Sequence, residues 1–309
     1  MNIQNPREVY GRTLVELGRE DPRVVVLEAD LGKSTMTCYF ETAFPERFFE
    51  MGIAEANMTS FAAGLSLVGK VPFTNSFAVF AAGRAYDQIR QSICVPELNV
   101  KIVGSSAGLS DCGDGATHQS VEDVAIMRAL PNMTVLVPAD GNETRAMTRT
   151  MARHEGPVYL RIGREDMPDV LPSGTEFVIG RPVLLREGTD AVVFANGVMV
   201  ARALAAADTL AGRGVSVRVV NVSSLKPVDA DALRALAQGM RAMVTAEEHS
   251  LIGGLASVIG DVFHGSGVPF ETVGIADQFG QSAGTYGELL TAYHLTAEDI
   301  VAAVEKALG

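Results

Sequence analysis

Short runs of β-branched and other apolar residues alternate with longer amphipathic stretches along the whole chain. The runs lie at 23–27, 100–103, 133–137 and 157–161 in the first half, and at 190–194, 215–220 and 242–245 in the second. A short apolar run is typical of a buried strand, and the stretches between the runs have the spacing of helices. The pattern therefore predicts an α/β fold with mainly parallel sheets flanked by helices.

The alternation lapses once, between about 167 and 182, where the chain reads MPDVLPSGTEFVIGRP. Proline and glycine at this density mark a connecting segment. We therefore expect a first α/β domain at 1–170, a linker at 171–184 and a second α/β domain at 185–309. The last helix of the second domain is expected to begin after Thr296, a suitable capping residue, and to close at Gly309.

Composition and charge narrow the class of protein. With 309 residues, 47% hydrophobic and 20% charged, the chain is globular and long enough for two cores. The net charge of −12 disfavours nucleic acid and anionic membrane surfaces as partners. The three cysteines do not have the spacing of metal ligands. The N-terminus lacks the apolar core of a signal peptide. The uncharged stretch 71–83 is too short to cross a bilayer. We expect a cytoplasmic protein without a metal site of its own.

One carboxylate, Glu55, stands in the otherwise small and apolar segment MGIAEANM at 51–58. No basic residue follows before Lys70, so we expect no local ion-pair partner for it. A buried carboxylate favours a protonated or proton-sharing form, which suits proton exchange with a bound heterocycle. The alternative is that Glu55 is a surface residue of an amphipathic helix.

A glycine-rich loop, at 104–109 and 113–119, follows one predicted strand and precedes a helix expected to start near Val121. Ligands bind at such loops in open α/β sheets. His118 is the strongest single candidate in this loop, although an isolated histidine is commonly structural or simply exposed.

Two further motifs have competing interpretations. GKST at 32–35 follows a strand, but a P-loop would need a glycine five residues before Gly32, where Leu27 stands. Asp30 and Ser34 in this segment could simply form a turn. Phe73, Phe77 and Phe80 have helical spacing, which by composition alone predicts packing into a core.

Taken together, these motifs resemble the transketolase family of thiamine-diphosphate enzymes. The resemblance implies that Glu55 is catalytic and hydrogen-bonds the aminopyrimidine ring of the cofactor, driving it into its imino form. It also implies that Phe77 and Phe80 lie against that ring and that Asp30 lies near the cofactor. Thr74 replaces a further family aromatic, and RAYDQ at 84–88 is similar to the deoxyxylulose-phosphate synthase branch.

The same resemblance implies the substrate contacts. Asp114 and His118 match the family residues that bond the sugar's hydroxyl and carbonyl groups, with His118 able to relay protons. Ser34, Arg7 and Arg164 match residues that bind the sugar phosphate, and arginine suits this task because it offers paired donors. Arg161 is a weaker rival for the same task. Ser106 stands where many relatives have histidine, which implies substrates other than the common pentose phosphates.

The resemblance covers only the second half of a full-length transketolase. The half that holds Mg²⁺ and the cofactor's diphosphate is expected to be a separate N-terminal subunit, with which this chain forms an α2β2 assembly. The chain should therefore be inactive alone. The segment 247–250 in the second domain is expected to serve as turn and interface without a catalytic role.

The predicted function is that of the C-terminal subunit of a split transketolase, which transfers a two-carbon ketol unit from a ketose to an aldose. One alternative is the β subunit of a 2-oxoacid dehydrogenase E1 component, which is disfavoured because Thr117 precedes His118 where that branch has two successive histidines. Others are an enzyme like deoxyxylulose-phosphate synthase and a non-catalytic interaction subunit.

Overall fold

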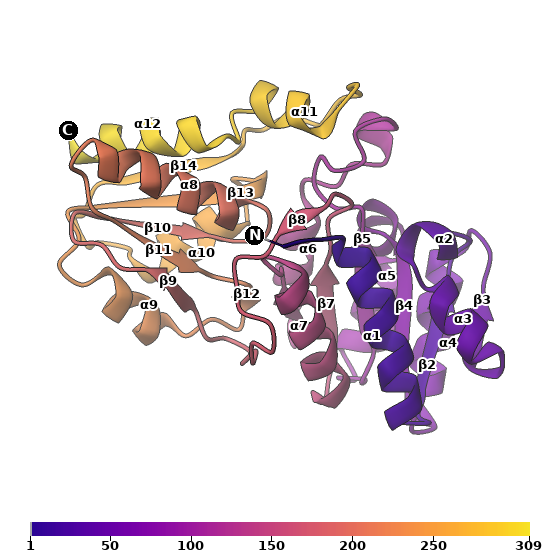
Figure 1. The fold of residues 1–309 in the computed structure, drawn as a ribbon. Coiled ribbons are helices and arrows are strands. Elements are labelled where there is room, and N and C mark those ends of the chain that lie inside the picture. Colours follow the sequence, from indigo (N-terminus) through magenta and orange to yellow (C-terminus); the bar gives the residue numbers. More distant parts are fainter. Residues whose placement is uncertain (1) are drawn as a thin grey trace.

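A computed structural model describes residues 2–309 of the chain, which fold into two large sheets flanked by helices and one small two-stranded sheet. Figure 1 shows the two halves side by side, with the N-terminal half in indigo to magenta and the C-terminal half in orange to yellow. The predicted α/β fold with two mainly parallel sheets is confirmed. Within residues 2–309, no helix has both the length and the apolar character needed to cross a membrane.

The first sheet has seven strands in the order β12-β6-β7-β5-β4-β2-β3. All neighbouring pairs are parallel except β12 with β6. Every residue of the central strands is buried, which explains why β2 and β7 show short apolar runs rather than alternating patterns. The strands are β2 (Val24–Glu28), β3 (Phe48–Glu50), β4 (Val71–Phe77), β5 (Lys101–Ser105), β6 (Thr134–Leu136), β7 (Val158–Arg161) and β12 (Ser224–Lys226).

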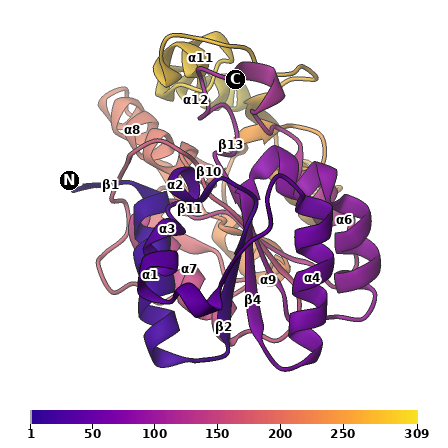
Figure 2. The same cartoon turned by 90° about the vertical axis from the view of Figure 1, so that its right-hand side faces the viewer.

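Helices cover both faces of this sheet. Figure 2 shows α1 (Pro6–Glu20) and α7 (Gly141–Arg153) on one side of β2 and β4, and α4 (Glu55–Leu67) and α6 (Asp123–Ala129) on the other. α1 begins at Pro6 because Asn5 accepts hydrogen bonds from the next two free backbone amides. The shorter helical segments are α2 (Gly32–Thr35), α3 (Cys38–Ala43), η1 (Pro45–Arg47), η2 (Val79–Arg84), α5 (Tyr86–Gln88), η3 (Ile89–Cys94) and η4 (Gly115–Thr117).

The second sheet has five strands in the order β14-β13-β10-β11-β9, of which only β9 runs antiparallel to its neighbour. The strands are β9 (Val183–Arg186), β10 (Ala191–Ala195), β11 (Val217–Asn221), β13 (Ala242–Ser250) and β14 (Phe270–Ile275). The helices are α8 (Met199–Gly212), α9 (Ala230–Ala237), α10 (Leu255–Val262), α11 (Tyr286–Ala292) and α12 (Ala297–Leu308). Thr296 caps α12 in a reciprocal pair with Asp299, as expected.

The two halves are joined by backbone pairing as well as by side chains. β12 belongs to the second half of the chain but extends the first sheet, with Ser224 opposite Leu136. Close by, the buried Glu143 on α7 accepts hydrogen bonds from Asn221 Nδ2 at 3.0 Å and from Ser223 Oγ at 2.6 Å. The chain's N-terminus is tied down by a small antiparallel sheet of β1 (Ile3–Gln4) and β8 (Met167–Pro168). The β12–β6 pairing and the hydrogen bonds of Glu143 connect the two large sheets.

Two local expectations are wrong. The spacing of Phe73, Phe77 and Phe80 suggested a helical stripe, but Phe73 and Phe77 lie on strand β4, and only Phe80 lies in the π-helical turn η2. The segment 247–250 was expected to form a turn at an interface; it does lie at an interface, since Glu248 contacts Leu109 of the first half, but it is the end of strand β13 and not a turn. The first error arises because a short apolar segment gives no reliable periodic signal. The second arises because the polar side chains of 247–250 gave no indication that sheet neighbours and the first half of the chain bury them.

Candidate functional site

Glu55 is the first residue of α4 and is 1% exposed, which confirms the expectation of a buried carboxylate and excludes the surface alternative. It accepts hydrogen bonds from Arg84 Nη1 at 2.9 Å and from Ser76 Oγ at 3.2 Å. The expectation that Glu55 has no ion-pair partner close by in sequence holds, but in the folded chain it is paired. Arg84 reaches it from η2, because β4 runs past the start of α4 and η2 follows β4 directly.

An aromatic group lies beside this ion pair. The guanidinium carbon of Arg84 is 4.7 Å from the centre of the Phe80 ring. The rings of Phe77 and Phe80 are nearly parallel, with centroids 6.3 Å apart. His118 meets both rings edge-on, at 6.2 Å from Phe77 and 5.4 Å from Phe80. The fold thus brings together residues from α4, β4, η2 and the glycine-rich loop.

This arrangement suits a flat, nitrogen-containing ring. A buried carboxylate can hold a proton on a ring nitrogen, while an aromatic face packs against the ring. The planar guanidinium of Arg84 lies over Phe80 while it bonds to Glu55, so one planar group can contact both side chains. The aminopyrimidine of thiamine diphosphate is a group of this shape and chemistry. η2 is a π-helical turn, a geometry that is frequent at functional sites.

The glycine-rich loop that carries Asp114 and His118 is held in place by the second half of the chain. Glu248 on β13 accepts a hydrogen bond from the Leu109 backbone amide at 2.8 Å and another from Tyr286 Oη at 2.8 Å. Gln119 donates to the backbone carbonyls of Asp111 and Gln281. His118 is half-buried and Asp114 is exposed, so both can be reached by a substrate.

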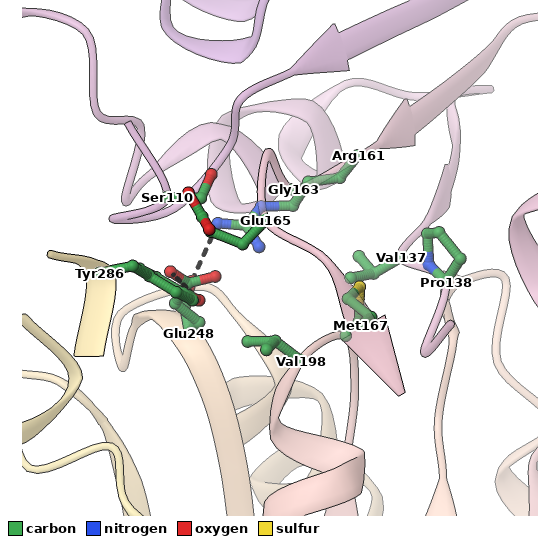
Figure 3. Close-up of a pocket in the computed structure, with 11 residues that line it drawn as sticks. Ser110, Val137, Pro138, Arg161, Gly163, Glu165, Met167, Val198, Glu248 and Tyr286 are labelled. Carbon is green, nitrogen blue, oxygen red and sulfur yellow. Dashed lines mark hydrogen bonds between the residues drawn. The ribbon is translucent and has the colours of Figure 1, made fainter. Parts of the chain in front are cut away.

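A small cavity lies where this loop meets the second half (Figure 3). Ser110 and Glu165 line it from the first half, and Glu248 and Tyr286 line it from the second. Its volume of about 20 Å³ is enough for a single water molecule but not for a sugar. We therefore assign the cavity to the junction between the two halves rather than to substrate binding.

Arg161 also belongs to this junction. Its Nε lies 3.0 Å from Asp123 Oδ2, and its Nη2 donates to the backbone carbonyl of Glu248 at 2.9 Å. The side chain of Arg161 is 7% exposed, and that of Asp123 is fully buried. Arg161 is therefore committed to the packing of the two halves, and the structure does not support it as a rival ligand for a substrate phosphate.

A second cluster of predicted residues forms around Arg7. Arg7 Nη1 donates to the backbone carbonyl of Ser34 on α2 at 2.9 Å. Arg164 lies near enough to affect Arg7 electrostatically, and the pKa of Arg7 is lowered, first by burial and then by the charge of Arg164. Arg164 itself is paired with Asp111, with 3.0 Å between Nη1 and Oδ2. The predicted phosphate ligands thus meet, together with an acidic residue that sequence reasoning did not single out.

Asp30 and Ser106 have unusual backbone conformations. Asp30 has a φ of 61° and is exposed, and its amide donates to Glu50 Oε1 at 2.9 Å. Ser106 has a φ of 51° and is fully buried, and its Oγ has no hydrogen-bond partner within residues 2–309. Because non-glycine residues rarely adopt positive φ, both positions are consistent with functional constraint. A direct substrate contact by Ser106 stays a prediction, since this structure does not expose its side chain.

Glu28, at the end of β2, holds the segment around α2 in place, and the sequence analysis did not single it out. Its buried carboxylate accepts hydrogen bonds from Thr35 Oγ1 at 2.7 Å and Thr37 Oγ1 at 2.5 Å, which fixes the short helix α2. Burial raises the pKa of Glu28 to about 7, although hydrogen bonds from Thr37 and Thr35 oppose the rise. The available signal was a charged residue at the end of an otherwise apolar strand.

Comparison with known proteins agrees with these motifs. Residues 4–169 match the family model described as transketolase, pyrimidine binding domain, and residues 180–300 match transketolase, C-terminal domain. The chain is 43% identical to a putative transketolase C-terminal section from Methanocaldococcus jannaschii, over 95% of this chain and 93% of that protein. It is 42% identical to the 6-deoxy-6-sulfo-D-fructose transketolase subunit SqwH of Clostridium sp. strain MSTE9, over 97% of this chain and 93% of that subunit.

A solved structure described as a split gene transketolase, inactive beta4 tetramer, superposes with a TM-score of 0.91. It is 52% identical to this chain, and the match covers 98% of each. The chain therefore belongs to the transketolase family, of which it contains a pyrimidine-binding domain followed by a C-terminal domain.

Proposed function

We propose that this chain is the C-terminal subunit of a split transketolase, which transfers a two-carbon ketol unit from a ketose to an aldose acceptor. The observation that supports this most directly is the convergence of Glu55, Phe80 and His118. The close match to proteins named as separate C-terminal sections or subunits supports the split organisation.

Each residue of the candidate site would have a distinct role in the reaction. Thiamine diphosphate, when bound, supplies the nucleophilic carbon that breaks and re-forms the sugar's carbon–carbon bond. Glu55 holds a proton at the aminopyrimidine ring, and Phe77 and Phe80 pack against that ring. His118, with Asp114 beside it on the loop, bonds the sugar's oxygens near the reacting carbon and can move a proton there.

The far end of the sugar would reach the second cluster. Arg7 and Arg164 offer paired donors to an anionic or hydroxylated group, and Ser34 lies on the helix that Arg7 contacts. Asp30 stands at the same carboxyl edge of the sheet, after β2, near the proposed cofactor position. In this proposal, Ser106 shapes the floor of the loop between the two clusters.

A separate N-terminal subunit would supply the Mg²⁺ and the contacts to the cofactor's diphosphate, in an α2β2 assembly. We infer that the complex works in the cytoplasm, because Cys38, Cys94 and Cys112 are free thiols, as expected in a reducing compartment.

The proposal is tested by a ketol-transfer assay with thiamine diphosphate and Mg²⁺, on the chain alone and mixed with its N-terminal subunit. Activity only in the mixture, lost in Glu55→Gln, would support it. A chain active by itself would overturn the shared-site argument. An active mixture that releases carbon dioxide from 2-oxoacids and transfers no ketol unit would favour the dehydrogenase alternative.

A further inference from the structure

The Asp111–Arg164 pair adds a negative charge to the cluster proposed to hold the far end of the sugar. Asp111 is 4% exposed, while the side chain of Arg164 is 36% exposed. The carboxylate therefore forms the inner side of the pair, and the guanidinium faces outward. A substrate group that binds Arg164 must share this guanidinium with a carboxylate 3.0 Å away.

The loop holds Asp111 firmly in this position. The Asp111 backbone carbonyl accepts from Gln119 Nε2 at 3.2 Å and from the Gly115 amide at 3.3 Å. The Arg164 backbone amide donates to Ser110 Oγ at 3.0 Å, so the neighbours of both partners are also tied together. Figure 3 shows Ser110 and Glu165, the residues adjacent to Asp111 and Arg164, on the wall of the junction cavity. The backbone of Asp111 is thus fixed by the loop, and its carboxylate is directed to Arg164 by the ion pair itself.

The charges around Arg7 do not sum to a strongly cationic site. Arg164 is the neighbouring cation, whereas Glu165, Asp111 and Asp166 are all close enough to act on Arg7 electrostatically. Two arginines alone would attract a phosphate dianion strongly. The three nearby carboxylates largely cancel the attraction of the two arginines for a dianion. A dianion placed beside the buried Asp111 would in addition be repelled directly by its like charge.

We propose that Asp111 is a specificity-determining residue that selects sugars whose far end carries at most one negative charge, and that it disfavours a phosphate dianion. Neutral hydroxymethyl and singly charged sulfonate ends both meet this condition. This inference rests on the proposed function, since it assigns the far-end subsite of the same active site. The inference restricts the substrates to sugars with a neutral or singly charged far end, a restriction that the two arginines by themselves would not indicate.

The test compares ribose with ribose 5-phosphate as acceptors, using the complete complex and hydroxypyruvate as donor, because hydroxypyruvate has no far end to bind. We expect Asp111→Asn to raise the ratio of kcat/KM for ribose 5-phosphate over ribose at least tenfold. Asp208→Asn is the matched control, since it removes the same charge from an exposed side chain that is paired with a different arginine, Arg186, on the second half of the chain. It should change the ratio less than threefold.

A ratio that rises less than threefold in Asp111→Asn would overturn the inference, whatever the preference of the wild-type complex. If the complex shows no ketol transfer at all, the proposed function fails, and Asp111 is then judged by binding of inorganic phosphate to the complex measured by calorimetry. Binding at least tenfold tighter in Asp111→Asn than in wild type would support the role of Asp111 independently. Equal binding would refute it.

Discussion

Arg84 Nη1 lies 2.9 Å from Glu55 Oε2, so the carboxylate expected to act on the cofactor is already paired with a cation from its own chain. The side chain of Arg84 is 49% exposed, whereas that of Glu55 is 1% exposed. The guanidinium also covers the face of Phe80. An aminopyrimidine ring that contacts both Glu55 and Phe80 must therefore displace Arg84 or share these contacts with it.

Replacement of Arg84 should accordingly ease cofactor binding. A half-exposed ion pair contributes about 0–1 kcal/mol, which corresponds to a factor of up to about five in affinity. We expect Arg84→Gln to tighten the binding of thiamine diphosphate to the complex by about two- to fivefold, measured by calorimetric titration. Arg90→Gln, an exposed arginine two turns further on, is the control and should have no effect. Weaker cofactor binding in Arg84→Gln would show instead that Arg84 helps to hold the cofactor.

Glu55→Gln should remove proton transfer while preserving the fold. The amide keeps the shape of the side chain and can still bond Arg84 and Ser76, but it cannot hold the proton. We expect kcat for ketol transfer to fall by about 10²–10⁴-fold, in steady-state assays of the complex. Glu46→Gln, at an exposed carboxylate, should retain full activity. A loss below tenfold in Glu55→Gln would contradict the catalytic role of Glu55.

Asp123→Asn should strongly destabilise the chain. It would leave the buried Arg161 without its countercharge, and it would weaken the hydrogen bond that Tyr159 Oη donates at 2.7 Å. Breaking a buried ion pair from one side costs about 3–5 kcal/mol. The apparent free energy of unfolding in urea should fall by that amount. Glu8→Gln, which breaks an exposed pair with Arg12, should change it by less than about 0.5 kcal/mol. Equal effects of the two changes would be inconsistent with a structural role for the Arg161–Asp123 pair.

Stability should fall as the pH rises through neutrality, in part because of Glu143. Burial raises the pKa of Glu143 from 4.5 to about 7, against the hydrogen bonds it accepts from Ser223, Ala139 and Asn221. The folded chain therefore binds a proton that the unfolded chain loses between these two values. The resulting stabilisation is fully present below pH 4.5 and is lost as the pH rises through 7.

At about 1.4 kcal/mol per pKa unit, Glu143 contributes about 3 kcal/mol to this pH dependence. The measurement is urea unfolding of wild type and Glu143→Gln between pH 5 and pH 8. The wild type should lose more stability than the variant over this range, because glutamine does not titrate. Parallel profiles would show that Glu143 does not titrate in this window. Burial also raises the pKa values of Glu28 and Glu247 to about 7. These two residues should account for the decrease in stability with pH that remains in Glu143→Gln.

The sequence by itself determined the fold class and the position of the main motifs. The runs at 24–27 and 100–103 are buried in the first sheet, because strands covered on both faces are mostly apolar, with Lys101 as a buried exception. The small and apolar residues around Glu55 allowed either a buried or a surface carboxylate, and the fold decided for burial. The glycine-rich loop followed from its composition and its place after a strand.

The tertiary structure alone decided which side chains meet. Local patterns report which residues are buried, but neighbouring strands are chosen by the whole sheet, so the approach of Arg84 to Glu55 and of Asp111 to Arg164 could not be read from spacing. The order of β2, β4 and β5 places the loops after these strands along one edge, where residues distant in sequence lie side by side. The charges of the site depend on those pairings, and for this reason its chemistry became visible only in the folded chain.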